Sequence, residues 1–100
     1  MRILFDQGTP VPLRAELTSH DVATAFEKGW AELGNGELLR LAEAEFDVLI
    51  STDRNLRYQQ DLSRCRLAVL VLTTTSWPRI RKEVRRVLDA LSDVLPGEYR

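Results

Sequence analysis

The sequence predicts an α/β fold in which a mainly parallel four-stranded sheet lies between two layers of helices. Short apolar segments alternate with segments of helical periodicity, a pattern that is typical of βαβ units. Right-handed crossovers between parallel strands then place helices on both faces of the sheet. The expected strand order is 2-1-3-4. With 100 residues, the chain has the length of one domain, expected over residues 1–100.

The four expected strands are short runs of mainly aliphatic and β-branched side chains. Each run is bounded by charged or turn-forming residues, and each is too short for a core helix. The last run is apolar throughout, as expected of a strand that is covered on both faces. The strands are expected at residues 2–5, 22–25, 47–50 and 67–72.

Helices are expected between these strands. Thr9 can cap a short helix that has Pro10 at its first position, which is a favoured combination. Asn35 can cap a second helix over residues 37–45. A short polar helix is expected over residues 54–62.

The C-terminal segment gives the clearest helical pattern. Ser76 can cap it, and its apolar side chains recur at steps of three and four residues. This periodicity predicts one continuous helix with one apolar stripe. The stripe consists of Ile80, Val84, Val87, Leu88, Leu91 and Leu95.

The net charge of −1 combines an acidic first half with a basic second half. Residues 1–50 hold nine acidic and four basic side chains, whereas residues 51–100 hold six acidic and ten basic ones. A basic half favours an anionic partner, although an arginine-rich composition also follows from a GC-rich genome. The single cysteine excludes an internal disulfide framework. With no long apolar segment and no signal-peptide pattern, a cytoplasmic protein without membrane contact is expected.

Acidic side chains follow the ends of two expected strands. Asp6 follows the first strand and Asp53 follows the third. In an open parallel sheet, ligands bind beyond the carboxyl ends of the strands where the strand order reverses, here between strands 1 and 3. Glu37, Asn35 and the hydroxyls of residues 73–76 are expected at the same edge. Hard oxygen ligands of this kind suit Mg²⁺ or Mn²⁺.

Each of these acidic residues also has a structural interpretation. Asp6 and Asp53 can each organise an Asx turn. Glu37, near a helix N-terminus, can be held there by the helix dipole and by capping geometry. His20, the only histidine, precedes the second strand and is therefore expected at the opposite edge of the sheet.

Basic and aromatic residues come directly after Asp53. Arg54, Arg57 and Tyr58 would hold the backbone and one base of a single-stranded nucleic acid. The alternative is a solvated helix face with Tyr58 packed inward.

Three short motifs resemble those of the PIN-like proteins of bacteria, which are related to PIN-domain nucleases and VapC-type toxins. They are Asp6-Gln7-Gly8, residues 35–42 (NGELLRLA) and residues 51–56 (STDRNL), in the family's order and spacing. The family carries an acidic residue and Asn after the first Asp, where this chain has Gln7 and Gly8. Asn35 likewise stands where an Asp is expected.

The resemblance implies a PIN-like fold and a Mg²⁺- or Mn²⁺-dependent endoribonuclease, such as the toxin of a toxin–antitoxin pair. It implies an antitoxin-like protein and a second copy of the chain as partners. Because neutral residues replace acidic ones, the alternative is a catalytically degenerate PIN-like module that binds RNA or a protein. A receiver-like regulator would need a second acid beside Asp6 and a Lys after a fifth strand, neither of which is expected here. The implied catalytic residues are Asp6, Asp53 and Glu37, with Asn35 as a further metal ligand and Thr52, Arg54, Arg57 and Tyr58 as RNA contacts.

Overall fold

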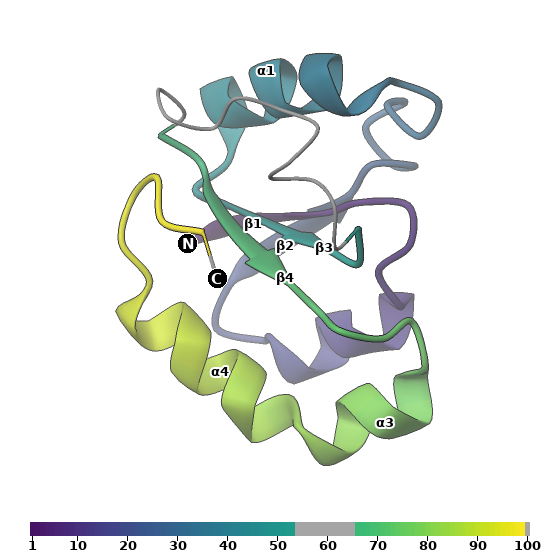
Figure 1. The fold of residues 1–100 in the computed structure, drawn as a ribbon, viewed down its shortest axis with the longest axis vertical. Coiled ribbons are helices and arrows are strands. Elements are labelled where there is room, and N and C mark those ends of the chain that lie inside the picture. The colour runs from purple at the N-terminus through teal and green to yellow at the C-terminus, as the bar shows by residue number, and fades with distance from the viewer. Residues whose placement is uncertain (54–65, 100) are drawn as a thin grey trace.

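Four parallel strands form one sheet in the order β2-β1-β3-β4, with helices on both of its faces (Figure 1). This computed structural model describes residues 1–53 and 66–99. The predicted α/β class, the parallel sheet and its strand order are confirmed. The elements are β1 (Arg2–Phe5), η1 (Val11–Glu16), β2 (Asp21–Thr24), α1 (Asn35–Glu45), β3 (Val48–Ser51), β4 (Ala68–Val71), α3 (Trp77–Lys82) and α4 (Val84–Asp93).

The strand β1 lies inside the sheet, and its two neighbours determine which strand ends lie side by side. It pairs with β2 on one side and with β3 on the other. The chain leaves β1 toward β2 and then crosses back to β3, so the strand order reverses between β1 and β3. The residues that follow these two strands therefore meet at one edge of the sheet.

Side chains alternate between two hydrophobic cores, one on each face of the sheet. Ile3 and Phe5 pack with η1, α3 and α4, whereas Leu4 packs with α1. Figure 1 shows α1 on one face, and η1, α3 and α4 on the other. Because β1, β3 and β4 are largely buried on both faces, their sequences are mainly apolar, whereas the edge strand β2 is partly exposed and includes Asp21 and Thr24.

Two predicted helix caps are wrong. Pro10, and not Thr9, stands at the cap position of η1. The buried hydroxyl of Thr9, which follows β1, instead lies 2.8 Å from the carbonyl oxygen of Ile50 in the neighbouring strand β3. Gly34, and not Asn35, precedes the first residue of α1, without a side-chain cap.

The C-terminal segment forms two helices where one was predicted. The break falls at Glu83, whose N–H donates to the carbonyl oxygen of Ile80 (2.9 Å) in a tighter turn. The bend lets α3 contact η1 while α4 runs back along the sheet. The apolar stripe ends at Leu91, since Leu95 lies beyond α4 and is 64% exposed. No helix among the described residues is long and apolar enough to cross a membrane.

After α4 the chain returns along the outer edge of β4. The N–H of Val69 donates to the carbonyl oxygen of Glu98 (2.8 Å), and Tyr99 forms a parallel bridge with Val69. Gly97, at a φ of 76°, turns the chain into this position. No strand was expected after β4, and this bridge covers only one residue of the β4 edge.

The opposite edge of the sheet, along β2, is closed by an ion pair. Arg14 donates to the carboxylate of Glu27 and, through Nη2, to the carbonyl oxygen of Val22 (3.1 Å). The same carboxylate accepts the N–H of Thr24 (2.9 Å), and the Thr24 hydroxyl accepts the N–H of Glu27 (3.0 Å). This reciprocal arrangement is that of a capping box. The pair therefore occupies one acceptor and one donor on the outer side of β2.

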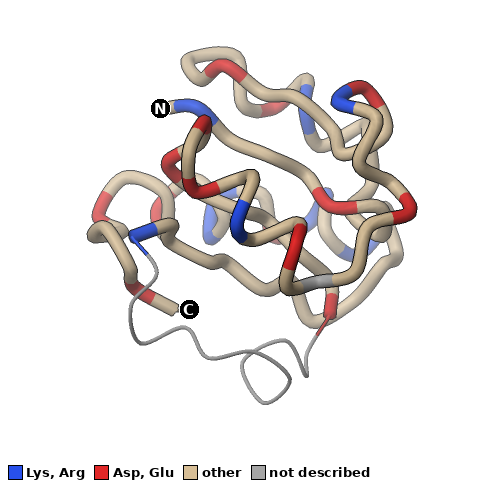
Figure 2. Tube along the Cα trace, turned by 90° about the horizontal axis from the view of Figure 1, so that it is seen from above, with Lys and Arg blue, Asp and Glu red and all other residues tan. Residues whose placement is uncertain are grey.

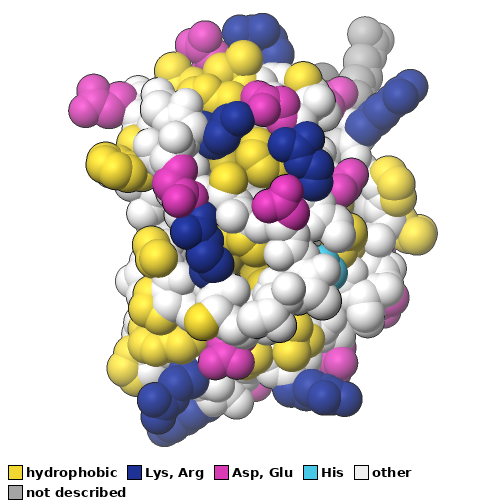
Figure 3. Space-filling view, turned by 180° about the vertical axis from the view of Figure 1, so that it is seen from behind, with side chains coloured by type: hydrophobic (Ala, Val, Ile, Leu, Met, Phe, Trp, Pro, Cys, Tyr) yellow, Lys and Arg dark blue, Asp and Glu magenta, His cyan; other side chains and the backbone are white. Residues whose placement is uncertain are grey.

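Among the described residues, the charge asymmetry of the sequence does not become two oppositely charged sides. Figure 2 shows acidic and basic positions interspersed along the trace. In the first half, three cations are joined to nearby carboxylates, as in the pair between Lys28 and Glu45 (2.8 Å). On the face shown in Figure 3, basic and acidic side chains alternate with apolar ones between them.

We expect Glu27→Gln to lower the urea midpoint of unfolding at pH 7. The hydrogen bond from Arg14, followed by that from the N–H of Thr24, lowers the pKa of Glu27. A carboxyl group whose pKa is lowered by folding adds stability above its unfolded pKa, and this stability is lost as the pH falls through the folded value. The difference between the variant and the wild type should therefore shrink below about pH 4.3, the ordinary glutamate pKa.

Urea titrations at pH 7 and at about pH 3 measure this difference. Glu43→Gln is the matched control, because Glu43 is exposed and has no ion pair among the residues that the structure describes. A Glu27→Gln deficit of equal size at both pH values would contradict the assignment.

Candidate metal and RNA site

A pocket of about 220 Å³ lies where β1 and β3 end. Asp6, Thr52 and Asp53 line it, together with apolar side chains such as Trp30 and Leu33. This is the edge at which the strand order reverses. The structure thus brings together two of the predicted acidic residues and the predicted threonine.

The carboxylate of Asp6 is held in place by its neighbours. Oδ1 accepts the N–H of Gly8 (3.2 Å) and lies 3.0 Å from the hydroxyl of Thr9, while Oδ2 accepts the hydroxyl of Ser51. The contact with Gly8 forms an Asx turn, the structural interpretation of this residue. A carboxylate has about four acceptor positions, so these contacts leave one on Oδ2 for a further ligand.

Ser51 connects the two acidic residues. Its hydroxyl, fully buried at the end of β3, donates to Oδ2 of Asp6 and accepts the N–H of Asp53 (3.0 Å). No role of Ser51 was predicted from the sequence. A hydroxyl at the end of a fully apolar strand was the available signal, because a buried hydroxyl requires a partner. Ser51 fixes the side chain of Asp6 relative to the backbone of Asp53.

Thr52 lies directly against the backbone of Gly8. A Cβ atom at position 8 would overlap the hydroxyl oxygen of Thr52. The absence of a side chain at Gly8 therefore makes room for this hydroxyl in the pocket.

We expect Gly8→Ala to lower the free energy of unfolding by about 1–3 kcal/mol, the usual range for overpacking. Removing the overlapping hydroxyl with Thr52→Ala should recover most of this loss. A double-mutant cycle from urea unfolding measures the coupling. Strictly additive effects of the two substitutions would show that residues 8 and 52 do not compete for the same space.

Glu37 does not join this pocket. It lies in the first turn of α1, with its carboxylate exposed and 3.4 Å from the guanidinium of Arg40. Within residues 1–53 and 66–99, no three His, Cys, Asp or Glu side chains lie close enough together to hold a metal ion. The predicted group of three carboxylates is therefore not formed. The side chain of Asn35 lies outside the described part of the structure.

The remaining predicted contacts either lie outside the described residues or line another pocket. Arg54, Arg57 and Tyr58 lie outside the described residues, so their role stays a prediction. Thr73 and Thr74, expected beside the acidic residues, instead line a second and larger pocket.

His20 lies at the amino-terminal ends of the strands, opposite to the carboxyl ends where the acidic pocket lies, as expected from its place before β2. Its Nδ1 is 3.3 Å from the amino group of Met1. Burial, followed by the positive charge of that amino group, lowers the pKa of His20. The imidazole is therefore remote from the acidic pocket.

Comparison of the chain with protein-family models, curated proteins and solved structures finds no match. A fold of this class hosts many functions, so the function has to be argued from the site. That site consists of two strand-end aspartates and a threonine in one pocket, with a buried serine between the aspartates.

Proposed function

We propose that this chain is a PIN-like protein that hydrolyses RNA phosphodiester bonds with one Mg²⁺ or Mn²⁺ bound near Asp6 and Asp53. The observation that carries this proposal is that both aspartates line a single pocket where the strand order reverses. Proteins commonly bind Mg²⁺ through one or two carboxylates together with substrate phosphates. Two carboxylates therefore suit one cation rather than two.

The donor set of the pocket fits such a cation. Asp6 retains an acceptor position on Oδ2, and its hydrogen bonds to Gly8 and Ser51 orient it as metal-binding carboxylates usually are. Asp53 would supply the second carboxylate. A bound divalent cation activates a water molecule and neutralises charge on the phosphate oxygens. The hydroxyl of Thr52 would donate a hydrogen bond to the phosphate.

The resemblance to PIN-like proteins supports the RNA part of this proposal. Arg54 and Arg57 would pair with phosphates, and Tyr58 would stack on a base. By the same resemblance, the chain would be the toxin of a toxin–antitoxin pair, inhibited by an antitoxin-like protein and active as a homodimer.

One observation favours a second function, that of a catalytically degenerate PIN-like module that binds RNA or a protein. The hydrogen bonds of Asp6 serve the local turn and the contact with Ser51, and Glu37 is turned to Arg40. Gln7 and Asn35 moreover stand where the family pattern has acidic residues, and Gly8 lacks the side chain that the pattern has there. Weak metal binding would follow.

Isothermal titration with Mn²⁺ tests the proposed function. We expect micromolar binding by the wild type, loss of binding in Asp6→Asn and in Asp53→Asn, and retained binding in Glu37→Gln. The last variant is the matched control, because it removes a nearby carboxylate that does not line the pocket. Absence of binding by the wild type would overturn the metal site and favour the degenerate module.

A further inference from the structure

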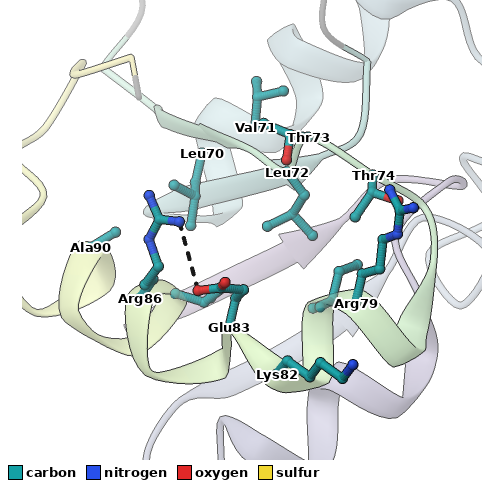
Figure 4. Close-up of a pocket in the computed structure, with 12 residues that line it drawn as sticks. Leu70, Val71, Leu72, Thr73, Thr74, Arg79, Lys82, Glu83, Arg86 and Ala90 are labelled. Carbon is teal, nitrogen blue, oxygen red and sulfur yellow. Dashed lines mark ion pairs between the residues drawn. The ribbon is translucent and has the colours of Figure 1, made fainter.

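The larger pocket, of about 570 Å³, lies between β4 and the bend that joins α3 to α4 (Figure 4). Residues 70–74 line it from the strand side. Consecutive side chains of a strand point to opposite faces, and both Leu70 and Val71 of β4 line the pocket, so the edge of β4 borders it. We call this pocket the β4 groove.

In the part of the chain that the structure describes, the edge of β4 is unpaired at this groove. The N–H of Leu72 donates inward to the carbonyl oxygen of Ser51 (2.8 Å), whereas the N–H of Val69 donates outward to Glu98 (2.8 Å). Because peptide groups alternate in direction along a strand, Val71 presents its N–H and C=O outward. Among the described residues, no strand pairs with Val71 on that side.

The helical wall opposite this edge is basic. Arg79 and Lys82 of α3 and Arg86 of α4 line the groove, with Glu83 as the one acidic residue among the described lining residues. Arg86 lies 3.6 Å from Glu83, the ion pair drawn as a dashed line in Figure 4. In the part of the chain that the structure describes, Arg79 and Lys82 have no ion-pair partner. The apolar floor between the wall and the edge comes from Leu70, Leu72, Ile80, Val87 and Ala90.

We propose that the β4 groove binds an extended acidic segment of a partner protein, which adds to the sheet as a strand beside Val71. Strand addition gives affinity through main-chain hydrogen bonds, and side-chain contacts give specificity. The alternating N–H and C=O groups of the edge match a peptide backbone, which favours a peptide over a nucleic acid. Acidic side chains of the segment would meet Arg79 and Lys82. This proposal does not depend on a metal at Asp6.

The first test uses a fluorescein-labelled hexapeptide that alternates valine and glutamate. Fluorescence anisotropy should show saturable binding that weakens with salt, and no binding of the matching valine–lysine peptide. The double variant Arg79→Glu, Lys82→Glu should weaken binding at least about tenfold, since it reverses the charge that complements the peptide. Arg81→Glu is the matched control, because Arg81 is exposed on α3 but does not line the groove. No binding to the wild type, or equal weakening by Arg81→Glu, would overturn the proposal.

The second test concerns the main-chain hydrogen bonds. Binding of the peptide should protect the amide of Val71 from hydrogen exchange, and N-methylation of one alternating set of peptide residues should abolish binding while methylation of the other set should not. Equal effects of both sets would overturn strand addition. So would a single-stranded RNA oligonucleotide that displaces the peptide and binds more tightly. Protection of Val71 by self-association without peptide would show that a second copy of the chain occupies the groove.

Discussion

Asp6→Asn is expected to abolish Mg²⁺- or Mn²⁺-dependent cleavage of single-stranded RNA without unfolding the protein. The asparagine oxygen can still accept the N–H of Gly8, and its amide can donate to the hydroxyl oxygen of Ser51. The local structure is therefore retained, whereas a negatively charged ligand is lost. Loss of an outer partner of a metal ligand alone costs about 10–100-fold in affinity or activity, so loss of the ligand itself should cost more than about a hundredfold.

The measurement is the cleavage rate of a labelled RNA oligonucleotide with Mg²⁺ or Mn²⁺, with circular dichroism as the check on folding. Glu37→Gln should cleave like the wild type, since Glu37 does not line the pocket. Cleavage by Asp6→Asn at the wild-type rate would contradict the role of this residue. A wild type that binds RNA but never cleaves it would favour the degenerate module.

Leu91→Ala is expected to lower the free energy of unfolding by about 2–5 kcal/mol, the usual cost of truncating a core leucine. Leu91 is 2% exposed and packs in the core between α4 and the sheet. Leu95→Ala is expected to change the free energy of unfolding by less than about 0.5 kcal/mol, because Leu95 is 64% exposed. The two positions belong to one apolar stripe in the sequence, so the pair tests where that stripe stops contacting the core.

Urea unfolding of the two leucine variants at neutral pH provides the comparison. Large losses of unfolding free energy at both positions would mean that α4 continues to Leu95 and packs there. Small losses at both positions would mean that α4 does not pack on the sheet as the structure has it.

The strand order and the layers were predictable because their signals are local. Each strand is a short apolar run, and parallel strands with right-handed crossovers leave few arrangements. The meeting of Asp6 and Asp53 followed from the same argument, because parallel strands end at one edge of the sheet. This prediction required only that each aspartate follows directly after its strand.

Features that depend on tertiary contacts escaped prediction. The break at Glu83 leaves the 3.6-residue periodicity intact, so the apolar stripe continues through it. The bridge of Tyr99 with Val69 covers a single residue and has no period at all. The role of Ser51 depends on the carboxylate of Asp6, which follows a different strand. The direction in which Glu37 points depends on how α1 lies over the sheet.

The two edge strands of the sheet, β2 and β4, differ in how far their outward-facing N–H and C=O groups are already bonded. This difference determines on which side a further strand can add to the sheet. On the β2 side, Arg14 takes the carbonyl of Val22 and Glu27 takes the N–H of Thr24, so an incoming strand would find one acceptor and one donor of this edge already occupied. On the β4 side, no strand within residues 1–53 and 66–99 pairs with Val71. Two copies joined through β4 would expose only their closed β2 edges. Sheet extension would therefore end in a pair and would not continue into a fibre.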